Sequence, residues 1–175
     1  MHLSLSSSTI RYWQSGDELA LAKHANNYNV WINLRNSFPY PYTLQDAQTW
    51  VMIANATQPV TNFALEVNGE AVGGIGLIIQ PDVYCKSAEV GYWLSEKYWN
   101  RGIITEALQA ITQYGFNTLE LERIYAGVFE WNLKSARVLE KAGYKLEGRL
   151  TKSVLKDGKL IDSLLYAQVK PTGIP

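Results

Sequence analysis

The stretch that decides the fold runs from Glu89 to Ala107 and reads EVGYWLSEKYWNRGIITEA. It predicts a strand, then a short polar loop that contains Gly102, then a helix that begins near Ile103. The first amides of a helix have no partners within the helix, and the helix dipole makes that end partly positive. A loop that bends into such an end can bind phosphate through backbone amides, and a glycine lets the backbone approach closely. The stretch therefore indicates a candidate anion-binding loop.

A second glycine cluster has a different meaning. Gly73, Gly74 and Gly76 stand inside a predicted strand and do not open a helix, so they do not form a dinucleotide-binding fingerprint. Glycines inside a strand are typical of a bulge or of a close approach by neighbouring atoms. We expect one of these two roles here.

Helical and strand patterns alternate on both sides of the deciding stretch. Tight turns are predicted at Asn68-Gly69 and Asp157-Gly158, where both residues favour the positive φ of a hairpin turn. Thr43 and Asp46 predict a capped helix start, Asn132 another, and Gly143 a helix end. The predicted helices cover residues 17–25, 30–35, 44–56, 103–118 and 133–142, and the predicted strands 10–13, 63–67, 71–79, 87–94, 123–129, 144–155 and 160–169. This order predicts an α/β (α+β) fold with one mixed, twisted sheet and helices on both faces.

Length and composition favour one globular domain over residues 1–175. Lys plus Arg and Asp plus Glu number 16 each, so net charge gives no reason to expect a nucleic-acid or membrane partner. Cys85 is the single cysteine, which fits a reducing compartment. The sequence shows neither a secretory signal pattern nor a long apolar span, so we expect a cytoplasmic protein.

The deciding stretch and the segment from Asn132 to Tyr144 together resemble the GNAT superfamily of acetyl-coenzyme A-dependent N-acetyltransferases. The similarity is greatest to the branch that contains the ribosomal-protein N-terminal alanine and serine acetyltransferases. The residues that carry the resemblance are Gly91-Tyr92-Trp93-Leu94, Trp99-Asn100-Arg101-Gly102-Ile103-Ile104-Thr105-Glu106-Ala107, Asn132, Ser135, Leu139-Glu140-Lys141, Gly143 and Tyr144. The order of predicted elements fits that fold over nearly the whole chain.

The resemblance implies acetyl-coenzyme A as cosubstrate, held in a V-shaped split between the strands that end near Leu94 and Phe129. Its pyrophosphate would lie on backbone amides of the run Asn100, Arg101, Gly102, Ile103, Ile104 and Thr105. Main-chain groups of Trp93 and Leu94 would bind the pantetheine arm, and Asn132 would contact the cofactor nearby. Two residues depart from the family pattern. Asn100 stands where this branch often has glycine, and Ile104 stands where the family usually has glycine or alanine. We expect the Ile104 side chain to point into the core.

The reaction that the resemblance implies needs a base, an oxyanion donor and a proton for the leaving thiolate. Glu89 is the candidate base, and a surface glutamate is the alternative. Ser135 is the candidate proton donor, because the tyrosine of many relatives is replaced here by Leu139; an ordinary first-turn serine is the alternative. No metal is needed, and no Cys/His cluster is present in the sequence.

The acceptor is expected between Asn27 and Trp50, where the aromatic side chains Tyr28, Trp31, Phe38 and Tyr40 could bind an amine-bearing group. The alternative is that these rings are ordinary core. Three functions stay open: an acetyltransferase for protein N-termini, one for small amines such as polyamines, amino sugars, amino acids or antibiotics, and a catalytically silent acyl-coenzyme A-binding module. The oligomeric state also stays open, a homodimer included.

Overall fold

The computed structural model describes residues 2–56 and 58–171. The chain divides into two compact units. Residues 1–76 and 92–107 form the first unit, and residues 77–91 and 108–175 form the second. Each unit combines helices with strands, and the single parallel strand pair described makes the strand arrangement a mixed one. The predicted α/β class is therefore confirmed.

The first unit has its strands in the order β1-β2-β3-β4, all antiparallel. The turn between β3 and β4 has φ of 52° at Asn68 and 79° at Gly69, as the hairpin prediction requires. Its elements are β1 (His2–Ser4), β2 (Thr9–Arg11), α1 (Glu18–Ala25), α2 (Tyr28–Trp31), α3 (Leu44–Ala56), β3 (Asn62–Val67), β4 (Glu70–Ile79) up to Gly76, the end of β5, the 3-10 turn η2 (Glu96–Tyr98) and the start of α4.

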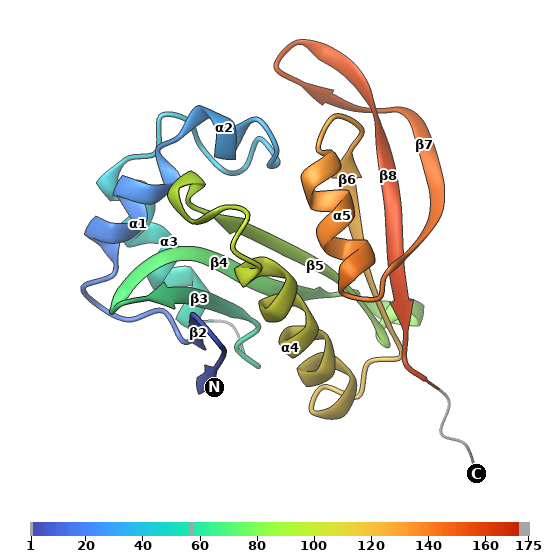
Figure 1. Cartoon of the computed structure of the whole chain (residues 1–175), viewed down its shortest axis with the longest axis horizontal. Coiled ribbons are helices and arrows are strands. Elements are labelled where there is room, and N and C mark those ends of the chain that lie inside the picture. Colours follow the sequence, from blue (N-terminus) through green and yellow to red (C-terminus); the bar gives the residue numbers. More distant parts are fainter. Residues whose placement is uncertain (1, 57, 172–175) are drawn as a thin grey trace. The chain divides into compact units, whose positions relative to one another are not determined.

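The core of the first unit lies between α1, α3 and the strands β3 and β4, which lie beside these helices in Figure 1. Ala47, Val51 and Ala54 are spaced at helical intervals along α3, and all three are buried. They pack in one cluster with Leu21 and Ala25 of α1. This core supports the strand end that carries Trp93, since Trp93 packs against the same cluster.

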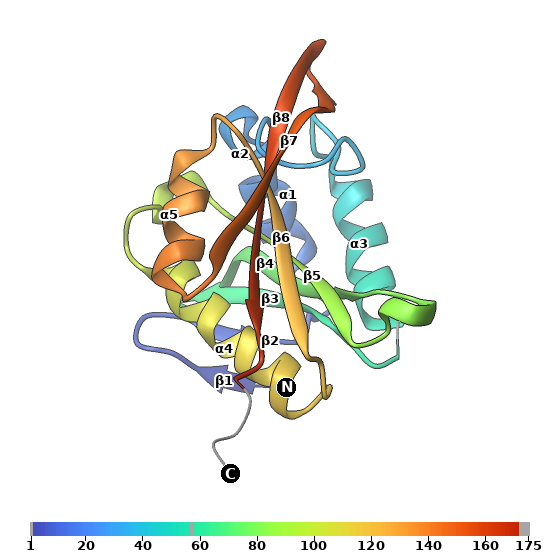
Figure 2. The same ribbon diagram turned by 90° about the vertical axis from the view of Figure 1, so that its right-hand side faces the viewer.

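The second unit has its strands in the order β5-β6-β8-β7. β5 and β6 are parallel, which requires a crossover between them, and α4 supplies it. Figure 2 shows α5 running along β6, β7 and β8. The elements are the end of β4, the 3-10 turn η1 (Asp82–Tyr84), β5 (Ser87–Leu94), α4 (Ile103–Asn117) from Leu108 on, β6 (Arg123–Phe129), α5 (Leu133–Lys141), β7 (Lys145–Lys156) and β8 (Lys159–Val169).

Close contacts hold α4 and α5 in the second unit. Gly115 of α4 leaves no room for a side chain, because a Cβ there would be 2.6 Å from the Ile124 side chain of β6. Tyr144, just after the Gly143 helix end, has its hydroxyl 2.7 Å from the Thr112 hydroxyl of α4. Gly143 has φ of 96°, as predicted for a left-handed helix end. These contacts fix both helices that flank β6.

The parallel pairing of β5 with β6 is short. It joins Ser87 to Arg123, Ala88 to Ile124 and Glu89 to Tyr125, whereas β6 continues along β8 as far as Phe129. Within the second unit, the pairing described between β5 and β6 therefore ends at Tyr125. The strand ends near Leu94 and Phe129, between which the sequence predicted a split, belong to the first and the second unit respectively, so that split stays a prediction.

Two element predictions need correction. The second helix was predicted over residues 30–35, but α2 spans Tyr28–Trp31, because the Asn27 side chain accepts a hydrogen bond from the Val30 amide at 3.2 Å and starts the helix earlier. The strand β1 was not predicted, since it is only three residues long and two of them are polar. Pairing with β2 defines it.

Candidate acetyl-transfer site

The end of β5 lies directly against glycines of β4. A Cβ at Gly73 would be 2.5 Å from the Trp93 carbonyl oxygen, and a Cβ at Gly74 would be 2.9 Å from the Trp93 indole nitrogen. The glycine cluster is thus a close packing point, one of the two roles expected for it. The Leu94 carbonyl accepts a hydrogen bond from the Trp99 indole at 2.8 Å, which ties the following loop to the strand end.

The loop enters α4 in a conformation suited to anion binding. Asn100 and Gly102 both have positive φ, 61° and 79°. The Glu106 amide donates to the Gly102 carbonyl at 3.1 Å, so Gly102 occupies the cap position of α4. The amides of Ile103, Ile104 and Thr105 then lie in the first turn, where no carbonyl of the helix can accept from them. A Cβ at Gly102 would meet no atom within 4 Å, so the space next to this backbone is open.

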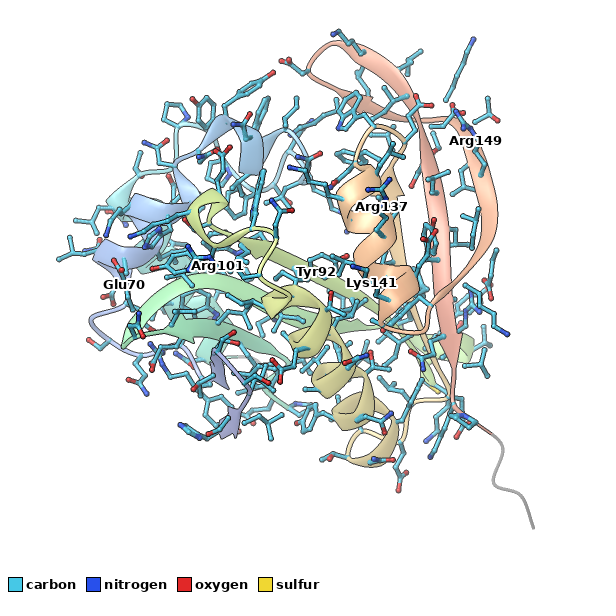
Figure 3. The ribbon with its side chains drawn as sticks, in the orientation of Figure 1. Glu70, Tyr92, Arg101, Arg137, Lys141 and Arg149 are labelled. Atoms are coloured by element: carbon cyan, nitrogen blue, oxygen red, sulfur yellow. The ribbon has the colours of Figure 1, made fainter. Side chains whose placement is uncertain are left out.

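Two cations flank the same loop. The Arg101 guanidinium lies 5.3 Å from the centre of the Tyr98 ring, and the Lys97 ammonium lies 5.6 Å from it. Tyr98 is itself buried, so its ring is a fixed platform beneath both cations. Figure 3 shows Arg101 on the loop that leads into α4. Positive charge therefore accompanies the helix start, as an anionic ligand requires.

The two isoleucines at the start of α4 are buried to different extents. Ile103 is buried with 2% of its surface exposed, whereas Ile104 is only half-buried. Ile104 stands one turn before the fully buried Leu108 but is itself not fully enclosed, so the expectation that it points into the core is met less completely than by its neighbour Ile103. Ile104 keeps its backbone amide in the first turn of α4.

The second unit positions the two polar residues predicted on α5. The Asn132 side chain accepts a hydrogen bond from the Ser135 amide at 3.2 Å, which confirms it as the helix cap. Ser135 is half-buried and lies one turn before the fully buried Leu139. Arg137 and Lys141, one turn apart and exposed, project from α5 in Figure 3. Sequence reasoning gave neither cation a role, although Lys141 is among the residues that carry the resemblance, because exposed basic residues on a helix are usual.

Glu89 lies on β5 before the strand end described above. Alternate residues of a strand face opposite sides, so Glu89, Gly91 and Trp93 share one side while Ala88, Val90 and Leu94 take the other. The second set is buried, and Glu89 is half-buried. The carboxylate thus emerges on the side of β5 that carries the Trp93 indole.

A strand, a loop with positive φ at a glycine, a helix start with unused amides and a capped second helix are the parts of a known acetyltransferase arrangement. The model of the acetyltransferase (GNAT) domain family matches residues 8–145. The chain belongs to this family. The match begins before β2 and ends in β7, so it includes every residue of the predicted phosphate loop and both polar residues of α5.

Known GNAT proteins resemble the chain in sequence and in fold. A probable N-acetyltransferase of Bacillus subtilis, YjcK, is 42% identical over 86 residues, which are 49% of this chain and 48% of the relative. The ribosomal-protein-serine acetyltransferase of Escherichia coli is 36% identical over 84 residues, 48% of this chain and 47% of the relative. The matches thus span about half the length of these curated relatives. The crystal structure of a GNAT-family acetyltransferase from Bacillus anthracis superposes with a TM-score of 0.82 at 27% identity, covering 97% of this chain and 98% of that one.

The acceptor-side residues predicted for this GNAT chain form one aromatic cluster in the first unit. Ring centres of Tyr28, Trp31 and Tyr40 lie 5.5 to 5.8 Å from one another, with Trp31 and Tyr40 stacked. Tyr28 and Tyr40 are each 45% exposed, so this cluster is not core. Phe38 is the exception, since it packs on Tyr42 at 4.8 Å and on Trp93 at 5.7 Å. Phe38 therefore links the acceptor side to the end of β5.

Two carboxylates of the first unit, Asp46 and Glu66, have structural partners. Asp46 accepts hydrogen bonds from the Thr43 amide at 2.8 Å and from the Thr43 hydroxyl at 2.6 Å, and these bonds lower the pKa of Asp46 below its usual value. Glu66 is paired with the buried Arg11. Both carboxylates stabilise the scaffold, as the helix-cap prediction required for Asp46.

Other reactive residues lie away from these features. His2 is on the exposed strand β1, and Cys85 is exposed after η1. Residues 2–56 and 58–171 contain no group of three or more His, Cys, Asp or Glu that could hold a metal ion. Within the same residues, no helix is both long and apolar enough to cross a membrane.

Sequence reasoning missed the polar contacts that join α1 and α2 to the start of the predicted phosphate loop. The His24 Nδ1 atom lies 2.9 Å from the Ser95 hydroxyl, and both residues are buried. Asn27 and Asn29 donate side-chain hydrogen bonds to Glu96. The partners are 67 to 71 positions apart in sequence, so no local pattern could have revealed them.

Proposed function

We propose that the chain is an acetyl-coenzyme A-dependent N-acetyltransferase that acts on a primary amine, with a protein N-terminus as the favoured acceptor. The observation that carries the proposal is the start of α4, where Gly102 at φ 79° has open space beside its Cα and opens a helix whose first amides have no acceptor within the helix. Membership of the GNAT family supports the same reading of that loop.

The residues present fit the cofactor that the family uses. Backbone amides from Asn100 to Thr105 would hold its pyrophosphate, with Arg101 supplying charge. This backbone run is called the phosphate cradle below. Trp93, Leu94 and Asn132 are proposed as further cofactor contacts. The Leu94 carbonyl already accepts the Trp99 indole, so only its second lone pair is open to a ligand.

Acetyl-coenzyme A, when bound, supplies an acetyl thioester. Glu89 would remove a proton from the acceptor ammonium, directly or through a water, so that the neutral nitrogen forms the new C–N bond while the C–S bond breaks. After the C–N bond has formed, the nitrogen would give up a second proton, which would pass through the Ser135 hydroxyl to the departing sulfur, so that coenzyme A leaves as a thiol. A backbone amide at the end of β5 would stabilise the negative charge on the carbonyl oxygen.

The preference for a protein N-terminus rests on the acceptor side. A polyamine acceptor calls for carboxylates free to bind several ammonium groups, but Asp46 and Glu66 are engaged by Thr43 and Arg11. The cluster of Tyr28, Trp31 and Tyr40 offers partly exposed rings suited to one ammonium and an extended apolar chain. The relatives do not decide between these acceptors, since they include both a ribosomal-protein-serine acetyltransferase and a spermidine N(1)-acetyltransferase of Escherichia coli. Small-molecule amines remain the alternative acceptor.

We also propose that residues 1–175 act as one acetyltransferase domain, in the cytoplasm. The family match runs through both compact units, which supports a single functional domain.

The test is calorimetric titration with acetyl-coenzyme A, followed by a thiol-release assay over N-terminal peptides and small amines. We expect binding, and release that depends on a peptide. Release with a small amine alone would replace the favoured acceptor by the alternative, and binding without release would indicate a silent module. Absence of binding would overturn the proposal.

Ser135→Ala and Glu89→Gln test the assigned roles in the same assay. Each is expected to lower kcat on the order of 100-fold, the scale of acid–base catalysis, while coenzyme A affinity changes by less than about threefold. The matched control is Ser153→Ala, whose hydroxyl donates to the Leu150 carbonyl in β7. Turnover retained in both variants would remove these two residues from the chemistry and leave the family assignment intact.

A further inference from the structure

The loop before the phosphate cradle is hydrogen-bonded to the acceptor-side helix α2. The Asn27 side-chain amide donates to one Glu96 carboxylate oxygen at 2.9 Å, and the Asn29 amide donates to both oxygens at 3.1 Å. Glu96 therefore accepts from two side chains of the same short segment. Bonds to an ionised acceptor are stronger than bonds between neutral groups, so this link fixes the position of α2 better than two neutral bonds would.

α2 depends on such outside contacts because it is only four residues long. A helix this short is not stable by itself in water. Asn27 serves it twice, since its carbonyl oxygen caps α2 through the Val30 amide at 3.2 Å while its amide group holds Glu96. Tyr28 and Trp31, two of the three rings of the aromatic cluster, are carried by this helix. The position of Glu96 thus sets the position of these rings.

A second link joins the same two regions one residue earlier in the loop. The Ser95 hydroxyl lies 2.9 Å from His24 Nδ1 at the end of α1, in a buried position. The Ser95 amide is also fixed, because it donates to the Val72 carbonyl of β4 at 2.8 Å. Ser95 is therefore held through both its side chain and its backbone, and Glu96 follows it directly at the start of η2.

The cradle side of the loop carries its own charges. Lys97 and Arg101 both lie over the Tyr98 ring, at 5.6 and 5.3 Å. An anion bound at the start of α4 would attract these cations and restrict the loop between them. Since Glu96 precedes Lys97 directly, such a restriction reaches the Glu96 carboxylate through a single peptide unit.

We propose that Glu96 is a positioning residue that couples occupancy of the phosphate cradle to the order of α2, so that coenzyme A binding sets Tyr28 and Trp31 for the acceptor. The inference rests on the proposed function, because it takes the cradle as the cofactor site and the aromatic cluster as the acceptor site. The coupling is reciprocal, so an acceptor bound on α2 also tightens coenzyme A.

The experiment is hydrogen exchange measured by mass spectrometry on peptides that cover residues 24–36, with and without saturating coenzyme A. In the wild type, coenzyme A is expected to slow exchange in α2 by at least about fivefold, the lower end of typical coupling between sites. Titration calorimetry with coenzyme A on the same samples measures binding independently of this readout.

Glu96→Ala removes the acceptor of all three bonds, whereas Asn29→Ala removes the two Asn29 bonds and leaves the one from Asn27. The slowing by coenzyme A should fall below about twofold in Glu96→Ala and should fall by a smaller amount in Asn29→Ala, while coenzyme A still binds. The double variant should behave like Glu96→Ala, because that change alone already removes every bond of the link. Glu120→Gln is the matched control, since that side chain is 79% exposed and lies outside this contact. Thermal unfolding of each variant verifies that it is folded.

The outcomes are distinct. Equal slowing in the wild type and in both folded variants would overturn the role of Glu96, as would binding of coenzyme A by the wild type without any slowing in α2. Failure of the wild type to bind coenzyme A would overturn the proposed function and the coupling together.

Discussion

Gly102 is the residue on which the proposed phosphate cradle depends most directly. Its φ of 79° is strained for any residue with a Cβ, at a cost of roughly 1–2 kcal/mol. A larger side chain would also occupy the open space beside the backbone. Gly102→Val is therefore expected to weaken coenzyme A binding by at least about tenfold, which corresponds to about 1.4 kcal/mol. Titration calorimetry measures this change.

The control for Gly102 is Gly148→Ala in β7. Gly148 also has no neighbour within 4 Å of a built Cβ, but its φ lies outside the positive range. The Gly148→Ala variant should bind coenzyme A with the affinity of the wild type. Wild-type affinity in Gly102→Val would show that the start of α4 is not where the pyrophosphate lies.

His24 makes stability depend on pH. Burial lowers the pKa of His24 below its usual 6.5, although Glu70, 3.2 Å from its Nε2 atom, acts in the opposite direction. The unfolded chain thus takes up a proton near pH 6.5 that the folded chain does not. The contribution of neutral His24 to the stability of the folded chain is complete above pH 6.5. It declines as the pH falls from there toward the lowered pKa of His24 in the folded state.

The measurement for His24 is urea unfolding of the wild type and of His24→Asn between about pH 7.5 and 5.5, the range in which an unfolded histidine titrates. Asparagine keeps a polar group near Ser95 but does not titrate. We expect the wild type to lose more stability than the variant on acidification. Parallel curves would mean that His24 keeps the same charge state in both forms of the chain.

At the level of helices, α5 begins at a residue with two separable roles. Asn132 caps the helix through the Ser135 amide and is a proposed cofactor contact. Serine caps a helix almost as well as asparagine, whereas alanine does not and costs about 1 kcal/mol. Asn132→Ser should therefore keep the free energy of unfolding, and Asn132→Ala should lower it by about that amount. If the amide contacts the cofactor, both variants lose coenzyme A affinity in calorimetry; full affinity in Asn132→Ser would leave capping as its single role.

Local signals explain which elements the sequence predicted well. The helix over 44–56 was predicted from Thr43 and Asp46, and both side chains make the expected capping bonds. The turns at Asn68-Gly69 and Asp157-Gly158 have positive φ at all four residues. Each of these features is set by residues within four positions of one another, so the sequence alone contains the information.

Long-range packing explains what the sequence did not predict. Which of Ile103 and Ile104 is the more deeply buried depends on the angle at which α4 leaves the loop, and a helical pattern permits either. The contact of Gly73 with Trp93 and the bonds of Glu96 to Asn27 and Asn29 join distant segments. Residue types in the candidate site could therefore be proposed, but not the contacts that hold them in place.

For the chain as a whole, the two compact units share elements. The unit boundaries fall inside β4, β5 and α4, each of which begins in one unit and ends in the other. Neither unit can lose its structure without breaking hydrogen bonds of a strand or helix that continues into the other. We therefore predict one cooperative unfolding transition, as expected for one domain.

Scanning calorimetry tests this prediction. With 175 residues and about 0.7 kcal/mol per residue, the calorimetric enthalpy should be roughly 120 kcal/mol near 60 °C and should equal the van't Hoff enthalpy. Units that unfold independently would instead give a van't Hoff enthalpy of about half the calorimetric one.

Scanning calorimetry in the presence of coenzyme A gives a second test of the single-domain prediction. At a concentration about 100 times its Kd, a ligand adds about 2.7 kcal/mol to the stability of the species that binds it. For a chain of this size, that should raise Tm by roughly 5–10 °C. Because the two units share β4, β5 and α4, the whole transition should move together. A part of the heat absorption that stays at its original temperature would show that the two units unfold separately, which would contradict the single-domain prediction even if the ligand binds.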